Sequence, residues 1–110
     1  MEFKDFKHLI DNKLDKLTWI DYDDSSITSE EGFSVSIDYY KNIGENKDKN
    51  QLLVNVYYKS VNISVVASTD PPACDNFAKW YFSKVEKLDQ DKENELESLR
   101  TEGEKLFKEL

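Results

Sequence analysis

Apolar and polar positions alternate along residues 51–69, the stretch of the chain richest in β-branched and aromatic residues. Because successive side chains of a strand point to opposite faces, this period of two predicts two strands. A reversal at Lys59 and Ser60 makes them a hairpin, and a reversal at Val61 and Asn62 leaves the same side chains on each face. The first alternative pairs Tyr58 with Val61, Val56 with Ile63 and Val54 with Val65, and one face then carries Leu52, Val54, Val56, Tyr58, Val61, Ile63, Val65 and Ala67. Two strands alone are marginal in water, so we expect further elements to cover that face.

Three further elements are predicted before this hairpin. Apolar residues three or four apart predict a helix over residues 2–16, with Phe3, Phe6, Ile10, Leu14 and Leu17 on one stripe. A first strand is expected over residues 17–22 and a second over residues 33–40, where Phe33, Val35, Ile37 and Tyr39 share one face. The polar residues 23–31 and 41–50 are expected to be exposed connections.

A long helix is predicted after the hairpin. Asp70 or Asp75 can cap its free N–H groups, and Pro71 and Pro72 suit its first turn. Its apolar stripe comprises Phe77, Trp80, Tyr81, Val85 and Leu88, and it resumes beyond a polar stretch at Leu96, Leu99, Leu106, Phe107 and Leu110. The spacing is nearer to an eleven-residue repeat than to heptads, which implies little left-handed supercoiling.

The length of this helix raises the question of where its second half lies. As one rod, residues 72–110 span roughly 57 Å at about 1.5 Å per residue, whereas a small domain measures about 30 Å. The second half therefore either projects beyond the sheet or folds back onto it. Because the polar stretch contains neither proline nor glycine, we expect residues 89–110 to project as a helical extension.

These elements predict an α+β fold with the order α-β-β-β-β-α. We expect one domain over residues 1–110, built as a four-stranded, mostly antiparallel meander with both helices on one face of the sheet. This class of fold supports many functions and therefore indicates none of them.

The charge of the chain changes this picture by indicating a kind of partner. The formal net charge is −8, which disfavours direct binding to nucleic acid or to an anionic membrane. Between Lys16 and Lys41 there is no basic residue, and the acidic residues there are Asp21, Asp23, Asp24, Glu30, Glu31 and Asp38. This acidic segment predicts a surface that docks on a basic one, and the alternative is solvated polar loops that keep the protein soluble.

Catalytic chemistry finds little support in the residues. His8 is the single histidine and Cys74 the single cysteine, and a lone cysteine near a helix start is more often a packing residue than a nucleophile. Asp21, Asp23 and Asp24 suggest a cation loop, but the glycine and glutamate that an EF-hand needs at its sixth and twelfth positions are absent. We therefore expect a non-enzyme with no cofactor and no metal. The charged N-terminus and the lack of a long apolar run favour a cytoplasmic protein.

Two further surfaces are candidates for partner binding. The outer face of the sheet is expected to carry Tyr40, Leu53, Tyr57 and Val66 among small polar residues, a composition found in adaptable binding surfaces and also on ordinary solvent faces. The C-terminal helix carries a seam for self-association, whose residues are Leu96, Leu99, Gly103, Leu106 and Leu110. Packing of that seam back onto its own domain is the alternative.

Three hypotheses about function follow. The leading one is a small acidic inhibitor that occupies a basic surface of a protein partner, such as a nucleic-acid enzyme; it would be a DNA mimic encoded by a phage against host defence. The second is a self-associating structural or regulatory subunit, a homodimer through the C-terminal helix. The third is an immunity protein that neutralises a toxin.

Overall fold

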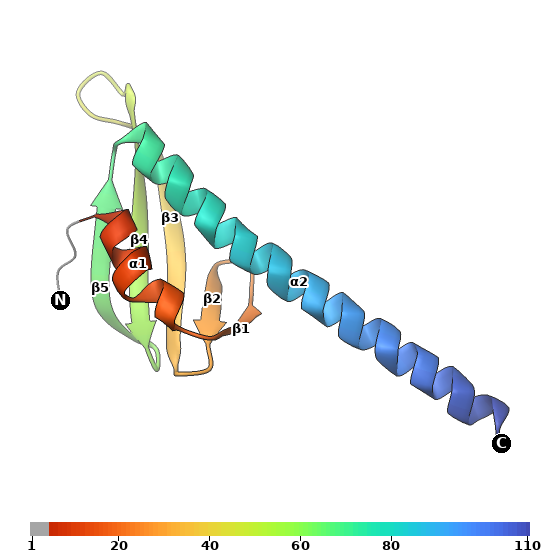
Figure 1. The fold of residues 1–110 in the computed structure, drawn as a ribbon. Helices are drawn as coiled ribbons and strands as arrows, with labels where there is room; N and C mark the ends of the chain where they lie inside the picture. The colour runs from red at the N-terminus through yellow and green to blue at the C-terminus, as the bar shows by residue number, and fades with distance from the viewer. Residues whose placement is uncertain (1–4) are drawn as a thin grey trace.

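The computed structural model of the protein describes residues 5–110. Its elements are α1 (Phe6–Asn12), the 3-10 helix η1 (Leu14–Lys16), β1 (Trp19–Tyr22), β2 (Ser26–Ser29), β3 (Phe33–Ile43), β4 (Lys49–Tyr58), β5 (Val61–Ser68) and α2 (Pro71–Lys108). The strands form one antiparallel sheet in the order β1-β2-β3-β4-β5. The predicted α+β fold is therefore confirmed, with an N-terminal helix, an antiparallel sheet and a long C-terminal helix (Figure 1).

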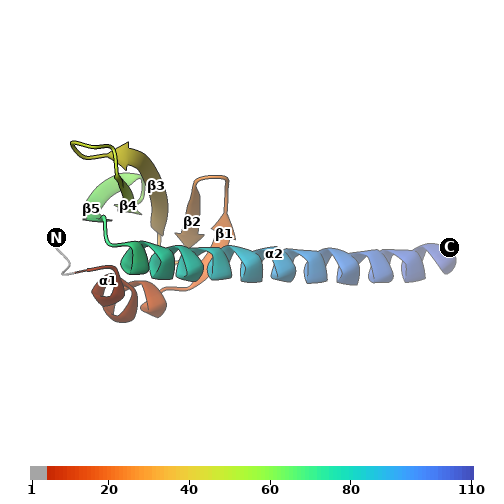
Figure 2. The same cartoon turned by 90° about the horizontal axis from the view of Figure 1, so that it is seen from above.

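The core lies between the sheet and the two helices. Figure 2 shows α1 and α2 on the same side of the strands, and the rings of Phe6 and Phe77 meet there with centroids 5.1 Å apart. Phe77, Val35 and Val54 are fully buried in this layer. Full burial of a large apolar side chain contributes about 1.5–3 kcal/mol, so these contacts hold the helices against the sheet.

The sheet has five strands rather than the four predicted. The additional strand is β2, which lies inside residues 23–31, where we expected a polar connection. Its single apolar residue, Ile27, pairs with Val35 and is fully buried. One apolar residue among serines and threonines gives no measurable period, so the sequence pattern could not distinguish this strand from a loop.

The hairpin of β4 and β5 turns where we predicted, but its register was wrong beyond the turn. Lys59 and Ser60 form the turn with φ of 47° and 71°, and Tyr58 pairs with Val61. Val56 then pairs with Ser64, because Ile63 is the extra residue of a β-bulge. The bulge reverses the faces that follow it.

The residues after the bulge show this reversal. Val65, which we expected on the covered face, is 52% exposed, whereas Val66, which we expected on the outer face, is 7% exposed. Val54 accordingly pairs with Val66. Because both positions hold valine, the alternation of apolar and polar residues cannot reveal the reversal.

The first helix is shorter than the predicted span of residues 2–16. It begins at Phe6 because Asp5 caps it, accepting a hydrogen bond from the His8 N–H at 2.8 Å. It ends at Asn12, and η1 then turns the chain so that Leu14 is buried. Phe3 of the predicted stripe lies outside the described residues.

The second helix is one unbroken α-helix of 38 residues. Asp70 caps it by accepting a hydrogen bond from the Ala73 N–H at 3.1 Å, and two prolines occupy its first turn. Every residue from Asp89 to the end is exposed, and the molecule measures 69 × 28 × 22 Å. The second half of α2 thus extends away from the sheet as a bare rod (Figure 1). No helix within residues 5–110 is long and apolar enough to cross a membrane.

Candidate interaction surfaces

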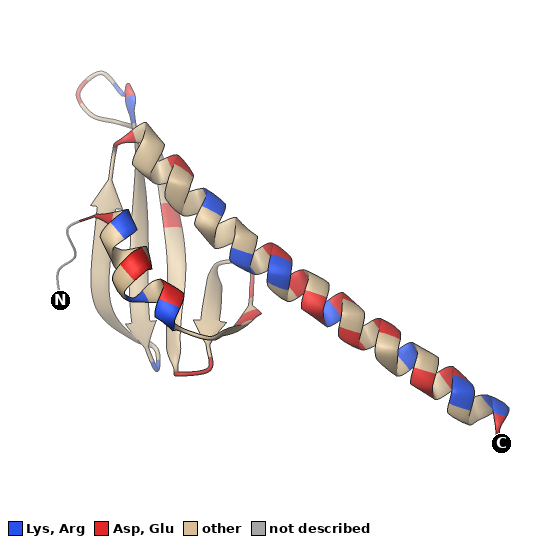
Figure 3. Ribbon diagram, viewed as in Figure 1, with Lys and Arg blue, Asp and Glu red and all other residues tan. Residues whose placement is uncertain are grey.

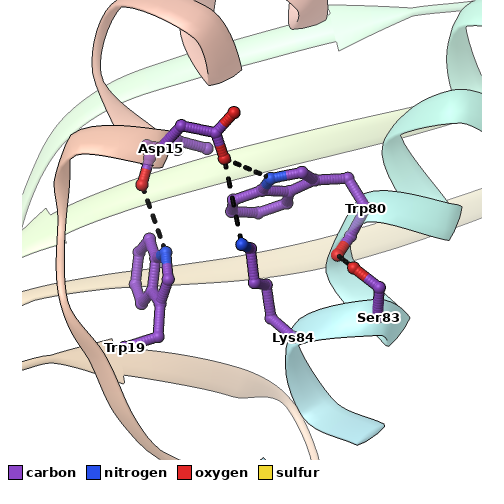
Figure 4. A network of polar contacts seen from close by, with 6 residues as sticks. Asp15, Trp19, Trp80, Ser83 and Lys84 are labelled. Carbon is purple, nitrogen blue, oxygen red and sulfur yellow. Dashed lines mark hydrogen bonds and ion pairs between the residues drawn. The ribbon is translucent and has the colours of Figure 1, made fainter. Parts of the chain in front are cut away.

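The direction in which α2 leaves the sheet is fixed by a polar cluster around Asp15, shown in Figure 4. Trp80 Nε1 donates a hydrogen bond to Asp15 Oδ1 at 2.8 Å, and Lys84 Nζ lies 3.9 Å from the same oxygen. Trp19 donates through Nε1 to the Leu14 carbonyl at 3.1 Å, and its ring meets that of Trp80 edge-on. These contacts join η1, β1 and α2 just before the helix becomes exposed.

A second set of contacts ties β1 to the first exposed turn of α2. The Tyr22 hydroxyl donates a hydrogen bond to Asp89 Oδ1 at 2.6 Å. Lys92 Nζ lies 2.7 Å from Asp21 Oδ1 and 4.5 Å from the centre of the Tyr22 ring. The Lys92 hydrogen bond lowers the pKa of Asp21, and the same bond raises the pKa of Lys92. The hydrogen bond to Asp89 raises the pKa of Tyr22.

The predicted acidic surface is divided among four places, of which the first is β1, where Asp21 lies. Asp23 and Asp24 lie in the turn between β1 and β2, whereas Glu30 and Glu31 lie in the turn at the opposite end of β2. The four residues of β2 separate these turns by roughly 13 Å. Asp38 lies on β3, on the face away from the helices, where it accepts a hydrogen bond from Asn55 at 3.0 Å.

Two of these carboxylates stabilise the fold by accepting hydrogen bonds from backbone N–H groups. Asp23 accepts hydrogen bonds from the backbone N–H groups of Ser25 and Ser26, both at 2.8 Å, which lowers its pKa. Glu31 accepts one from the Thr18 N–H at 2.6 Å, which lowers its pKa as well. Asp24 and Glu30 are exposed in the two turns. The six residues therefore do not share one face, although Asp21, Asp23 and Asp24 lie together on one hairpin.

Figure 3 shows a further acidic region that the sequence reasoning did not single out as a site. Residues 89–97 of α2 contain five acidic residues and one lysine. Because Tyr22 and Asp21 contact Asp89 and Lys92, the start of this acidic segment lies beside the β1–β2 hairpin. The local run of Asp and Glu along residues 89–97 was the signal that could have found it.

The outer face of the sheet is not covered by either helix (Figure 2). The register places Tyr57 opposite Ser34 and Leu53 opposite Asp38 on this face. Tyr40 is 48% exposed, whereas Leu53 and Tyr57 are half-buried among their strand neighbours. The bulge adds Val65 to the face in place of Val66. These side chains form a mixed surface in which apolar and small polar groups alternate.

The apolar stripe of α2 is interrupted by the polar residues 89–95 and resumes on the same face in the exposed half. Residues eleven positions apart lie almost above one another on an α-helix, so they form rows along α2. The first row is Cys74, Val85, Leu96 and Phe107, and the second is Phe77, Leu88, Leu99 and Leu110. The third is Tyr81, Lys92 and Gly103. Phe77, Tyr81 and Leu88 are buried against the sheet. The residues that follow in these rows beyond Leu88 are exposed, with Leu96 61%, Leu99 56% and Leu110 99% exposed.

The two residues considered for chemistry lie on neighbouring helices. Cys74 is half-buried, and its Sγ donates a hydrogen bond to the Ser68 carbonyl at 3.3 Å. His8 is exposed on α1. No group of three His, Cys, Asp or Glu side chains within residues 5–110 is placed to hold a metal ion.

Comparison of the chain with protein-family models, with curated proteins and with solved structures yields no match.

Proposed function

We propose that this protein is a non-catalytic, self-associating subunit in which the exposed half of α2 pairs with the same segment of another copy. The observation that carries this proposal is the apolar stripe of α2, of which the first part is buried in the domain and the second part, beyond residues 89–95, faces solvent. An amphipathic helix gains most of its stability from burial of its apolar face. Leu96, Leu99 and Leu106 are each more than half exposed, so a covering partner would stabilise them.

The expected strength of this pairing follows from the area involved. Complete burial of a leucine side chain contributes about 1.5–3 kcal/mol. Since the exposed side chains are already partly shielded, five from each helix give roughly 10 kcal/mol in total. Association costs about 4–15 kcal/mol in lost freedom. At the low end of that cost about 6 kcal/mol remains, which corresponds to a weak, concentration-dependent complex with a Kd on the order of tens of micromolar.

Sedimentation equilibrium of matched variants tests the proposal. Leu99→Lys with Leu106→Lys places two charges on the stripe, whereas Asn94→Lys with Thr101→Lys places the same two charges on the opposite face of the helix. We expect the native chain and the second variant to associate with rising concentration, and the first variant to remain at the 12.9 kDa of one chain. A native chain that stays monomeric at millimolar concentration contradicts the proposal.

A second candidate function is contact with a basic surface of a different protein. The observation that favours it is the contact between the β1–β2 hairpin and α2, which gathers Asp21, Asp23 and Asp24 beside the start of the acidic segment, residues 89–97. Opposite charges speed encounter and select partners. An inhibitor of a nucleic-acid enzyme, as a phage-encoded DNA mimic, and an immunity protein would both use such a surface.

Neutralising variants separate this candidate from self-association. Asp24→Asn with Glu93→Gln removes two charges from this region without touching the hydrogen bonds of Asp21, Asp23 and Glu31. We expect a basic protein captured by the native chain to bind this variant more weakly and with a smaller dependence on salt. Equal affinity and equal salt dependence would rule out this surface, and the stripe variants would leave such a complex intact.

A further inference from the structure

The orientation of the proposed helix pair is limited by what the first half of the stripe already contacts. Phe77, Tyr81 and Leu88 point into the sheet, and Leu99 and Leu110 follow on the same face at eleven-residue steps. A partner helix on the exposed half therefore lies on the side of α2 where the sheet lies. Two packed helices run about 8–10 Å apart.

A parallel partner would collide with the domain. In a parallel pair the partner helix continues alongside residues 71–88, and the space beside that stripe is filled by β1, β4 and α1, which α2 contacts. The sheet of the second copy lies on the same face of its own α2 and would overlap the first copy as well. An antiparallel partner runs the other way, so that each sheet lies beyond the far end of the paired segments. We propose that two copies pair antiparallel through residues 96–110, with Gly103 at the centre.

The spacing of the seam fits this arrangement. Leu96 lies seven residues before Gly103 and Leu110 seven residues after it, while Leu99 lies four before and Phe107 four after. Reversing the helix about Gly103 therefore places Leu96 opposite Leu110 of the other copy and Leu99 opposite Phe107. The outer layers on both sides of the centre therefore pair apolar side chains, which favours helix pairing. At the layers nearest Gly103, Leu106 lies opposite Arg100 of the other copy.

Gly103 itself has no role within one chain that explains it. It lies inside the exposed helix, where glycine costs about 1 kcal/mol relative to alanine, and a Cβ placed there meets no atom within 4 Å. In the antiparallel pair the two glycines face each other at the centre. Their missing side chains allow the two backbones to approach closely at that layer.

The distribution of charge favours the same orientation. Residues 89–97 carry five acidic residues and one lysine, whereas residues 98–110 carry Arg100, Lys105 and Lys108 against three glutamates. A parallel pair would place the two acidic segments side by side. The antiparallel pair instead joins the electrically balanced segments and leaves the acidic ones apart. It also brings Arg100 near Glu104 of the other copy.

This inference rests on the proposed self-association, and one distance measurement tests them separately. In a Cys74→Ala background, Glu86→Cys carries a nitroxide spin label at an exposed position of α2. An antiparallel pair centred on Gly103 separates the two labels by about 50 Å along the helix, at about 1.5 Å per residue. A parallel pair would hold them within about 30 Å, given helices about 10–12 Å wide lying 8–10 Å apart.

Each outcome of the dipolar measurement is decisive. A distance near 50 Å that disappears in Leu99→Lys with Leu106→Lys, and persists in Asn94→Lys with Thr101→Lys, supports the antiparallel pair. A distance below 30 Å overturns the antiparallel arrangement and leaves self-association standing. Loss of all dipolar signal in a monomeric sample overturns both. A signal that survives the stripe variant places the contact on another face and also overturns both.

Discussion

Individual side chains determine the angle at which α2 leaves the sheet. Asp15 accepts a hydrogen bond from the indole N–H of Trp80, and Asp89 accepts one from the hydroxyl of Tyr22. The partners in each pair lie 65 and 67 positions apart in the chain. A sequence pattern reports which residues share a face, and it carries no information on which distant polar groups meet. These contacts were therefore beyond prediction, although the helix and the strand that bear them were not.

The Trp80 hydrogen bond can be tested by removing its donor alone. Trp80→Phe retains an aromatic ring against Phe77 and Trp19 but loses the indole N–H. We expect the free energy of unfolding, measured by urea denaturation, to fall by about 0.5–1.5 kcal/mol. The loss should be smaller when Asp15 is already alanine, because the acceptor is then absent. Equal losses in both backgrounds would contradict the assigned contact.

The titrating contacts of the β1–β2 hairpin predict how stability depends on pH. Asp21, Asp23 and Glu31 have pKa values lowered from 3.8 and 4.5, so their contribution is present above those values and is lost as the pH falls through the lowered ones. Tyr22 and Lys92 have pKa values raised from 10.0 and 10.5. Their contribution is present below those values and is lost as the pH rises through the raised ones.

Thermal melting over pH 2–12 measures both limits. We expect the melting temperature to decline below about pH 4 and again above about pH 10. Asp23→Asn should weaken the acid decline, whereas Asp24→Asn, in the same turn but without these hydrogen bonds, should preserve it. A decline of the same size in both variants would show that the hydrogen bonds of Asp23 are not its cause.

Among the helices and strands, the ones that were predicted correctly are those in which apolar and polar residues alternate with a clear period. Residues 33–40 and 52–58 alternate cleanly, and both proved to be strands. The capped, proline-started helix after residue 70 was also correct. β2 was missed because Ile27 is its only apolar residue, and the bulge at Ile63 was missed because Val65 and Val66 are chemically identical. Both failures occur where the tertiary contacts, not the local pattern, decide the outcome.

The register of β5 predicts that a polar substitution is more costly at Val66 than at Val65. The alternation of apolar and polar residues alone predicts the reverse. Val66→Thr buries a hydroxyl in the core and should cost about 1–3 kcal/mol. Val65→Thr lies on the exposed face and should change the free energy of unfolding by less than about 0.5 kcal/mol. Urea denaturation of both variants decides the matter. A larger loss for Val65→Thr would contradict the bulge.

The turn of the β4–β5 hairpin is a place where stability can be gained. Lys59 and Ser60 both have positive φ, a conformation that asparagine and glycine adopt with less strain. Lys59→Asn with Ser60→Gly should therefore raise the free energy of unfolding by roughly 1 kcal/mol. The same two kinds of substitution within α2, Lys87→Asn with Ser83→Gly, should not raise it, because both positions are helical. A loss of stability at the turn would refute the assigned geometry.

At the scale of the whole molecule, the protein consists of a sheet covered by two helices and a bare helical rod. The sequence identified the rod's seam correctly as a stripe of apolar residues, since Leu96, Leu99 and Leu106 do lie on one exposed face. It could not reveal that the acidic residues are divided between two turns and two strands, because the two turns are separated by β2. The stripe, unlike the six predicted acidic residues, lies on one face of one element.

Hydrogen exchange of the backbone amides of residues 96–110 measures whether a second copy covers the stripe in the unaltered protein. If a second copy covers the stripe, protection of these amides should increase with protein concentration, while protection of β3 and β4 stays constant. Exchange in residues 96–110 that is equally fast at micromolar and millimolar concentration would contradict the account.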